Sequence, residues 1–115
     1  MPALASTSFE TFAEDVIASS QHMPVLVDLW AAWCSPCLVI APVLEQIAEE
    51  FVDELQIYKL EVDAGENMRI AGQYQARGFP TVILFQHGAE QARFHGAKPF
   101  GFIEEFLLQH AEFGN

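Results

Sequence analysis

The two cysteines of the chain, Cys34 and Cys37, are separated only by Ser35 and Pro36. Side chains three positions apart on a helical turn bring their Cα atoms to roughly 5–6 Å, which a disulfide tolerates. Such a pair can close into a disulfide and reopen with little movement of the backbone. The loop that it closes is too short to constrain the unfolded chain by much. The spacing therefore predicts an exchangeable dithiol/disulfide pair rather than a structural staple.

The surroundings of the pair predict unequal roles for the two cysteines. An apolar run over residues 25–30 precedes Cys34, and helical periodicity follows from Leu38. We therefore expect Cys34 at the start of a helix, where free N–H groups and the helix dipole stabilise a thiolate. Pro36 suits the first turn, because its missing N–H is not needed there. Cys34 is the expected nucleophile.

The spacing of the cysteine pair is also compatible with two roles outside disulfide exchange. The cysteines could be unrelated structural residues, or they could form half of a zinc site. Zinc needs about four ligands, and no two histidines lie at metal-ligand spacing. They are His22, His87, His95 and His110. We expect each of them to be an ordinary surface or boundary residue, and we expect no metal and no bound cofactor.

The run over residues 25–30 is apolar except for Asp28. This pattern predicts a central parallel strand that is covered on both faces. A buried carboxylate is costly unless it becomes neutral or finds a partner, so Asp28 is expected to titrate above an ordinary carboxyl. The alternative is that Asp28 faces solvent.

The remaining periodicities predict the elements that position the dithiol. Apolar residues at helical spacing predict helices over residues 9–20, 38–51, 66–74 and 100–110, with Pro42 expected to kink the second. Residues 55–62 alternate as a strand does, and residues 81–85 and 91–95 flank a turn at His87-Gly88. A parallel first half and an antiparallel hairpin predict an α/β fold with a mixed sheet and helices on both faces.

Length and composition predict one globular domain over residues 1–115, with 51% of the residues hydrophobic and 18% charged. Sixteen acidic residues against five basic ones give a net charge of -11, which disfavours nucleic acid and anionic membranes as partners. The first residues lack the pattern of a secretory signal, and no apolar stretch approaches the ~20 residues of a membrane span. A cytoplasmic location is expected.

Several motifs occur in an order that resembles the thioredoxin family over nearly the whole chain. They are VDLWAAWCSPC (27–37), IAPVL (40–44), RGFPT (77–81), FQHG (85–88) and Gly96. The resemblance implies the thioredoxin fold, a central mixed β-sheet flanked by four helices.

The resemblance also implies the catalytic roles. Cys34 would attack a target disulfide to give a mixed disulfide, and Cys37 would resolve it. Asp28 would be the buried carboxylate beneath Cys37 that relays a proton, and Lys59 the buried lysine near it. A lysine in an alternating strand is more often on the solvent face, and this alternative stays open for Lys59.

A substrate-facing loop is implied as well. Phe79-Pro80-Thr81 matches the segment whose proline is cis and faces the dithiol, so that a client peptide can lie along the backbone of Phe79. The alternatives are a core aromatic at Phe79 and an ordinary trans proline at Pro80. The residues expected to bind substrate are Trp33, Ser35, Pro36, Phe79, Pro80 and Gly96.

The chain departs from the family pattern at three places. Ser35 stands where the commonest motif has Gly, Leu38 replaces the basic residue that usually follows the second cysteine, and Gln75-Ala76 replaces Gly and a bulkier apolar residue. Leu38 removes a positive charge near the dithiol and extends its apolar rim. These departures leave open which substrates and which reductase the protein recognises.

The favoured function is a monomeric reductase of protein disulfides that receives electrons from a thioredoxin reductase, a flavoenzyme. The first alternative is a client-binding or chaperone-like module with little redox turnover, using an apolar rim of Trp33, Leu38, Phe79 and Pro80. The second is an oxidase or isomerase, which the same dithiol could perform at a higher reduction potential.

Overall fold

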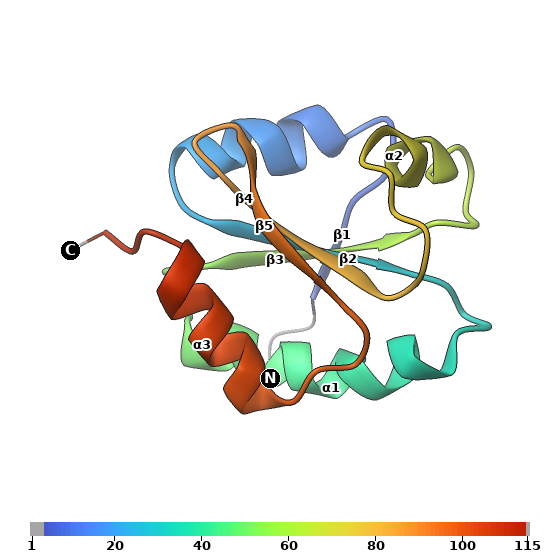
Figure 1. Ribbon diagram of the computed structural model, residues 1–115. Helices are drawn as coiled ribbons and strands as arrows, with labels where there is room; N and C mark the ends of the chain where they lie inside the picture. Colours follow the sequence, from blue (N-terminus) through green and yellow to red (C-terminus); the bar gives the residue numbers. More distant parts are fainter. Residues whose placement is uncertain (1–3, 115) are drawn as a thin grey trace.

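The computed structural model describes residues 4–114 and contains a five-stranded sheet in the order β1-β3-β2-β4-β5. Three α-helices and one irregular helical segment cover its two faces (Figure 1). The strands are β1 (Ala5–Ser6), β2 (Val25–Trp30), β3 (Gln56–Glu61), β4 (Thr81–Gln86) and β5 (Ala89–His95). The helices are η1 (Ala13–Ala18), η2 (Ser19–Gln21), α1 (Ser35–Glu50), α2 (Met68–Gln73) and α3 (Phe100–His110).

The strand β2 is central, because it pairs in parallel with β3 and antiparallel with β4. The first half of the sheet is parallel, and β4 and β5 form the antiparallel hairpin that the sequence predicts. The side chains from Val25 to Leu29 are all buried, as expected for a strand with neighbours on both edges and helices on both faces. The mixed sheet with helices on both faces confirms the predicted thioredoxin fold.

Two apolar clusters form the core, one on each face of the sheet. The segment η1–η2 and α2 cover one face, and α1 and α3 cover the other (Figure 1). Alternate residues of β4 divide between the two: Ile83 and Phe85 pack toward η1 and α2, whereas Val82 and Leu84 pack toward α1 and α3. The same alternation places Asp28, which pairs with Val82, on the face covered by α1.

The helix α1 begins one residue after Cys34, so the dithiol lies in its first turn. Cys34 is the N-cap residue, and Pro36 occupies the first turn as predicted. Pro42 lies inside the helix, which continues to Glu50. The expected kink at Pro42 stays a prediction.

The first helical segment differs from the expectation of a regular helix over residues 9–20. Residues 9–11 form a turn, residues 13–18 have π-helical hydrogen bonding, and a 3-10 turn follows. The carbonyl of Thr11 accepts hydrogen bonds from the N–H groups of both Glu14 and Asp15, which mixes two hydrogen-bond spacings at the start of this segment. Apolar spacing does not distinguish these helix types. The strand β1 was not predicted, because two residues are too few to show alternation.

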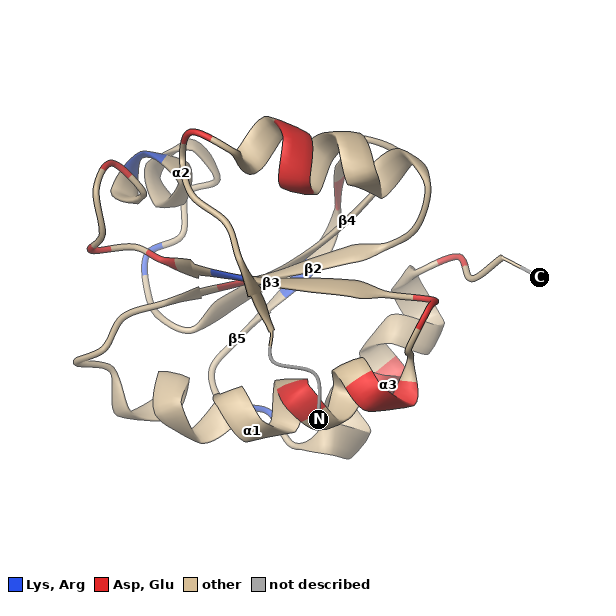
Figure 2. Cartoon of the chain, turned by 180° about the vertical axis from the view of Figure 1, so that it is seen from behind, with Lys and Arg blue, Asp and Glu red and all other residues tan. Residues whose placement is uncertain are grey.

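Acidic residues occur on the helices and loops on both sides of the sheet, and basic residues are few (Figure 2). This distribution follows from the net charge of -11. Among the described residues, no helix is long and apolar enough to cross a membrane.

Candidate active site

Cys34 and Cys37 form a disulfide, with their Cα atoms 5.3 Å apart. Both side chains are buried. The backbone N–H of Cys37 points at the sulfur of Cys34, at an N to Sγ distance of 3.3 Å. This confirms that the pair is close enough to form a disulfide, as the spacing predicted.

The start of α1 makes the two sulfurs unequal. Cys34 has extended backbone geometry as the N-cap, and its Sγ receives the N–H of Cys37. An N–H directed at sulfur at a helix N-terminus stabilises a thiolate on Cys34 once the disulfide is reduced. The structure gives Cys37 no corresponding bond among the described residues. The geometry therefore favours Cys34 as the nucleophile.

The loop before β4 faces the dithiol. The Phe79-Pro80 peptide bond is cis, and the carbonyl oxygen of Phe79 lies 3.3 Å from Sγ of Cys34. The N–H of Gly96 donates to the carbonyl of Pro80 at 3.0 Å, and Gly96 has φ +87°, in the region that favours glycine. The structure thus brings Phe79, Pro80 and Gly96 together at the edge of the disulfide.

Trp33 is the most exposed aromatic residue near the dithiol, with 68% of its surface accessible. Its indole Nε1–H donates to a carboxylate oxygen of Asp63 at 2.7 Å, and its ring meets that of Phe79 edge-on at 6.3 Å. Ser35 and Pro36 are exposed in the first turn of α1. Together they give the dithiol a partly apolar, accessible rim.

That rim differs in composition from the expectation. Pro80 is buried, and Phe79 is half-buried because it packs against the apolar cluster on the η1 and α2 face. Leu38 is 56% exposed and Val39 is also exposed. The exposed apolar side chains that flank the dithiol along the chain are therefore those of Trp33, Leu38 and Val39, and Pro80 contributes mainly its backbone.

Asp28 is fully buried, which excludes the alternative of a solvent-facing residue. Neither of its carboxylate oxygens has a hydrogen-bond partner among the described residues. Removal from water raises the pKa of Asp28 from 3.8 to about 7, and the positive charge of Lys59 opposes part of that rise. The carboxyl can therefore take up and release a proton near neutral pH.

Lys59 lies directly opposite Asp28 in the parallel pairing of β2 with β3. Its side chain is half-buried rather than on the solvent face. The ammonium lies 4.3 Å from the centre of the Trp30 ring, a cation–π contact. No ion pair joins Lys59 to Asp28 within residues 4–114 at a distance of 4.0 Å or less. Lys59 is thus a neighbour of the carboxyl but is not bonded to it.

Comparison with known proteins fits this geometry. A family model described as Thioredoxin matches residues 3–109. The chain belongs to the thioredoxin family. The thioredoxin of Mycolicibacterium smegmatis is 46% identical over 96 residues, which is 84% of this chain and 84% of that protein. The thioredoxin of Acidithiobacillus ferridurans is 44% identical over 105 residues, which is 91% of this chain and 94% of that protein.

A further relative joins two activities in its name. The bifunctional thioredoxin reductase/thioredoxin of Mycobacterium leprae is 48% identical over 88 residues, which is 76% of this chain and 18% of that protein. Membership of the thioredoxin family, together with the Cys34–Cys37 disulfide, makes the protein a thiol-disulfide oxidoreductase.

Two residues at the thioredoxin site were missed by the sequence reasoning. Asp63 accepts from the indole of Trp33 across 30 residues of sequence, for which the pattern holds no signal. Trp30 holds the ammonium of Lys59. A signal for Trp30 was present, because it lies two residues after Asp28 and strand alternation places both on one face.

The described part of the chain has no set of residues suited to a metal. Between residues 4 and 114, no three or more His, Cys, Asp or Glu side chains are grouped so that they could hold an ion.

Proposed function

We propose that the protein reduces disulfides in other proteins, with Cys34 as the nucleophile and Cys37 as the resolving cysteine. The observation that carries this proposal is the unequal environment of the two sulfurs. Cys34 caps α1, receives an N–H and lies 3.3 Å from the carbonyl of Phe79, whereas Cys37 lies inside the first turn. This environment suits the sulfur of Cys34 for attack on a client disulfide and that of Cys37 for attack on Cys34.

The reaction balances over two exchanges. The Cys34 thiolate attacks one sulfur of the client disulfide, the client S–S bond breaks, and the leaving client sulfur takes up a proton. Cys37 then loses its proton and attacks Cys34, which releases the second client thiol and leaves the Cys34–Cys37 disulfide of the structure. The second client sulfur also takes up a proton as it leaves, so the client gains two electrons and two protons. The protein loses two electrons, the proton of Cys37 and the proton that Cys34 gave up when its thiolate formed.

Asp28 is the proposed acceptor for the proton of Cys37. A general base works best when its pKa lies near the working pH, and burial raises the pKa of Asp28 to about 7. Asp28 lies on the sheet face that α1 covers, and its oxygens are free of other hydrogen bonds among the described residues. The positive charge of Lys59, opposite in the sheet, favours the ionised carboxylate of Asp28, which is the form that can accept the proton.

We propose a thioredoxin reductase as the electron donor that returns the protein to the dithiol form. In support, the Mycobacterium leprae relative is named as both reductase and thioredoxin in one chain. A monomer in the cytoplasm meets the requirements of this cycle, because a single chain holds both sulfurs and the client loop.

Trapping experiments test the division of labour. Cys37→Ser should accumulate clients on Cys34 as mixed disulfides, because the resolving thiol is absent. Cys34→Ser should trap almost none, since the sulfur of Cys37 receives no N–H from residues 4–114 that would stabilise its thiolate, unlike that of Cys34. Trapping is measured by non-reducing electrophoresis with a protein disulfide such as insulin. Equal trapping by the two variants would refute the assignment.

A second candidate function, client binding with little turnover, is favoured by the exposure of Leu38 and Trp33. If it is correct, unfolded apolar clients should bind even with the dithiol blocked. Leu38→Lys should then weaken client retention and speed reduction of the disulfide by a thioredoxin reductase, with the fold unchanged because the position is exposed. Absence of retention in the wild-type protein, with brisk turnover, would remove this candidate.

A further inference from the structure

His95 ends the strand β5 beside the loop that faces the dithiol. It pairs with Thr81, the first residue of β4, and the next residue, Gly96, donates its N–H to the carbonyl of Pro80 at 3.0 Å. The same loop brings the carbonyl of Phe79 to within 3.3 Å of the Cys34 sulfur. His95 is therefore adjacent to the backbone on which a client is expected to lie.

Hydrogen bonds to Thr81 determine which ring nitrogen of His95 carries a hydrogen. Oγ1 of Thr81 lies 2.6 Å from the carbonyl oxygen of Gly78 and 3.1 Å from Nδ1 of His95. A carbonyl oxygen only accepts, so the single hydroxyl hydrogen of Thr81 goes to Gly78. Thr81 must then accept from His95, and Nδ1 of His95 is the donor.

The outer nitrogen of the ring is left free. With hydrogen on Nδ1, the neutral imidazole carries a lone pair on Nε2, which is a hydrogen-bond acceptor. The side chain of His95 is exposed, and no group in residues 4–114 forms a hydrogen bond with Nε2. Because Thr81 is buried and bonded on both sides, the ring is held in place with its acceptor available.

The neighbouring polar side chain on β5 does not compete for the same partner. Arg93 lies two residues before His95, on the same face of the strand. Its guanidinium is occupied by both carboxylate oxygens of Glu90, at 2.5 and 2.7 Å. The exposed side chains on the α1 side of the dithiol, Trp33 and Leu38, offer apolar surface. Nε2 of His95 is thus an oriented acceptor beside the loop that faces the dithiol.

We propose that His95 is a specificity-determining residue for disulfide exchange, and that its Nε2 accepts a hydrogen bond from a backbone N–H of the client. An extended client presents N–H groups along both of its edges, and one of them can meet Nε2 while others face the loop at Phe79. The substrates favoured are extended segments with a free N–H beside the disulfide. Segments with proline at that position are disfavoured. This inference rests on the proposed reduction of protein disulfides.

Two substitutions separate the two nitrogens of the ring. His95→Asn places an amide N–H near the position of Nδ1, so it can keep the bond to Thr81 while removing the outer acceptor. His95→Gln reaches the position of Nε2 with an amide oxygen but gives up the bond to Thr81. A purely structural role of His95 would make Asn the better replacement, whereas client binding through Nε2 makes Gln the better one.

The experiment is a single-turnover reaction between the fully reduced protein and short peptides that contain one disulfide. One peptide series carries an N-methyl group on each amide near the cysteine in turn. We expect His95→Asn to raise the half-saturating peptide concentration about 2- to 10-fold, the range for one hydrogen bond, with the plateau rate unchanged. His95→Gln should stay within about 2-fold of wild type.

The N-methyl series supplies the decisive control. One methylated position should weaken binding to the wild-type protein and have no further effect on His95→Asn, because the acceptor is already lost. Equal effects of every methylated peptide on both proteins would overturn the inference, as would a Gln variant as weak as Asn. Failure of wild-type protein to reduce any of the peptides would instead overturn the proposed function.

Discussion

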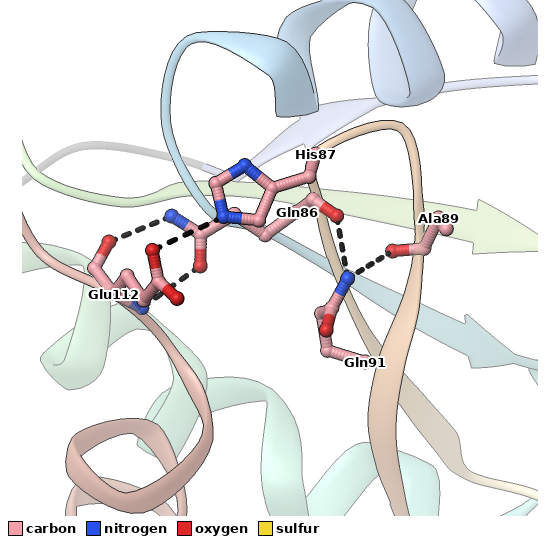
Figure 3. A network of polar contacts seen from close by, with 5 residues as sticks. All are labelled: Gln86, His87, Ala89, Gln91 and Glu112. Carbon is pink, nitrogen blue, oxygen red and sulfur yellow. Dashed lines mark hydrogen bonds and ion pairs between the residues drawn. The ribbon is translucent and has the colours of Figure 1, made fainter.

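Two buried polar side chains, Asp28 on β2 and Gln86 on β4, differ in their hydrogen bonding. Gln86 is 6% exposed and fully bonded: its Nε2 donates to the carbonyl of Glu112 at 2.6 Å, and its Oε1 accepts from the N–H of Glu112 at 2.8 Å (Figure 3). Asp28 is 0% exposed, and neither of its oxygens has a partner among the described residues.

The difference shows that Gln86 attaches one segment of the chain to another, whereas Asp28 is a titratable group without a hydrogen-bond partner among the described residues. The buried amide of Gln86 holds the segment after α3 against the sheet. Its hydrogen bonds to Glu112 replace the bonds to water that it loses on burial, so its burial carries no large free-energy cost. A buried carboxyl without partners destabilises the fold when it is ionised, and a pKa raised in this way is frequent at functional sites. Gln86 is the last residue of β4, at the opposite end of that strand from the loop that faces the dithiol, and Asp28 lies on the sheet face that the dithiol helix covers.

The largest expected effect is kinetic and belongs to Asp28. Asp28→Asn removes the proton acceptor and should slow resolution of the mixed disulfide at pH 7 by about 10²-fold, within the range for a general base. Formation of the mixed disulfide by Cys34 should change much less. Stopped-flow measurement of the two phases with a client disulfide checks both statements. A variant that resolves at the wild-type rate would remove Asp28 from the mechanism.

The next effect is on stability. The pKa of Asp28 rises from 3.8 to about 7 on folding, so between these values the folded state binds more protons than the unfolded state. Stability therefore falls as pH rises through this window, and the loss is complete above pH 7. The difference corresponds to about 4 kcal/mol, at about 1.4 kcal/mol per pH unit. Urea unfolding from pH 4 to 8 should show this slope in the wild type and lose it in Asp28→Asn.

Gln86→Ala should produce the reverse pattern. It removes two hydrogen bonds and leaves the backbone of Glu112 unpaired, so the free energy of unfolding should fall by about 1–3 kcal/mol. The rate of disulfide exchange in the folded protein should be unchanged. Gln91→Ala is the matched control, because it also loses an amide that donates to this turn but is exposed (Figure 3). A loss of exchange activity in Gln86→Ala would contradict the separation of the two regions.

The smallest effect is expected at the contact between the His87 ring and the Glu112 carboxylate in the same network. His87 and Glu112 approach to 3.2 Å, but their side chains are 59% and 81% exposed. Glu112→Gln should therefore change the free energy of unfolding by less than about 0.5 kcal/mol. The backbone of Glu112 keeps its bonds to Gln86 in this variant. A change as large as that of Gln86→Ala would mean that the charge, and not the buried amide, holds the tail.

The parts of the fold predicted from sequence are those whose signal is local. The apolar run with Asp28, the cysteines at a helix start and the hairpin around His87-Gly88 each lie within a few residues, and each was found in the structure. Periodicity also placed α2 and α3 to within about two residues. The irregular hydrogen bonding of the first helical segment leaves no trace in apolar spacing.

The contacts that sequence reasoning missed join distant segments. Trp33 with Asp63, Gln86 with Glu112, and Thr81 with His95 are separated by 30, 26 and 14 residues. Each is a hydrogen bond between common polar residues, so composition and spacing carry no signal for it. For this reason the sequence predicted His95 only as an ordinary surface or boundary residue, and its hydrogen bond to the buried Thr81 was missed.

The direction of exchange tests the proposed reduction of protein disulfides most directly. Reduced protein is mixed with an oxidised client protein, and oxidised protein with the reduced client, until both mixtures reach the same composition. Acid quenching and thiol alkylation then measure the four species. The proposal predicts that both mixtures end with the client mainly reduced and Cys34–Cys37 mainly oxidised. Mixtures that end with the client mainly oxidised and the protein mainly reduced would make it an oxidase and contradict the proposal.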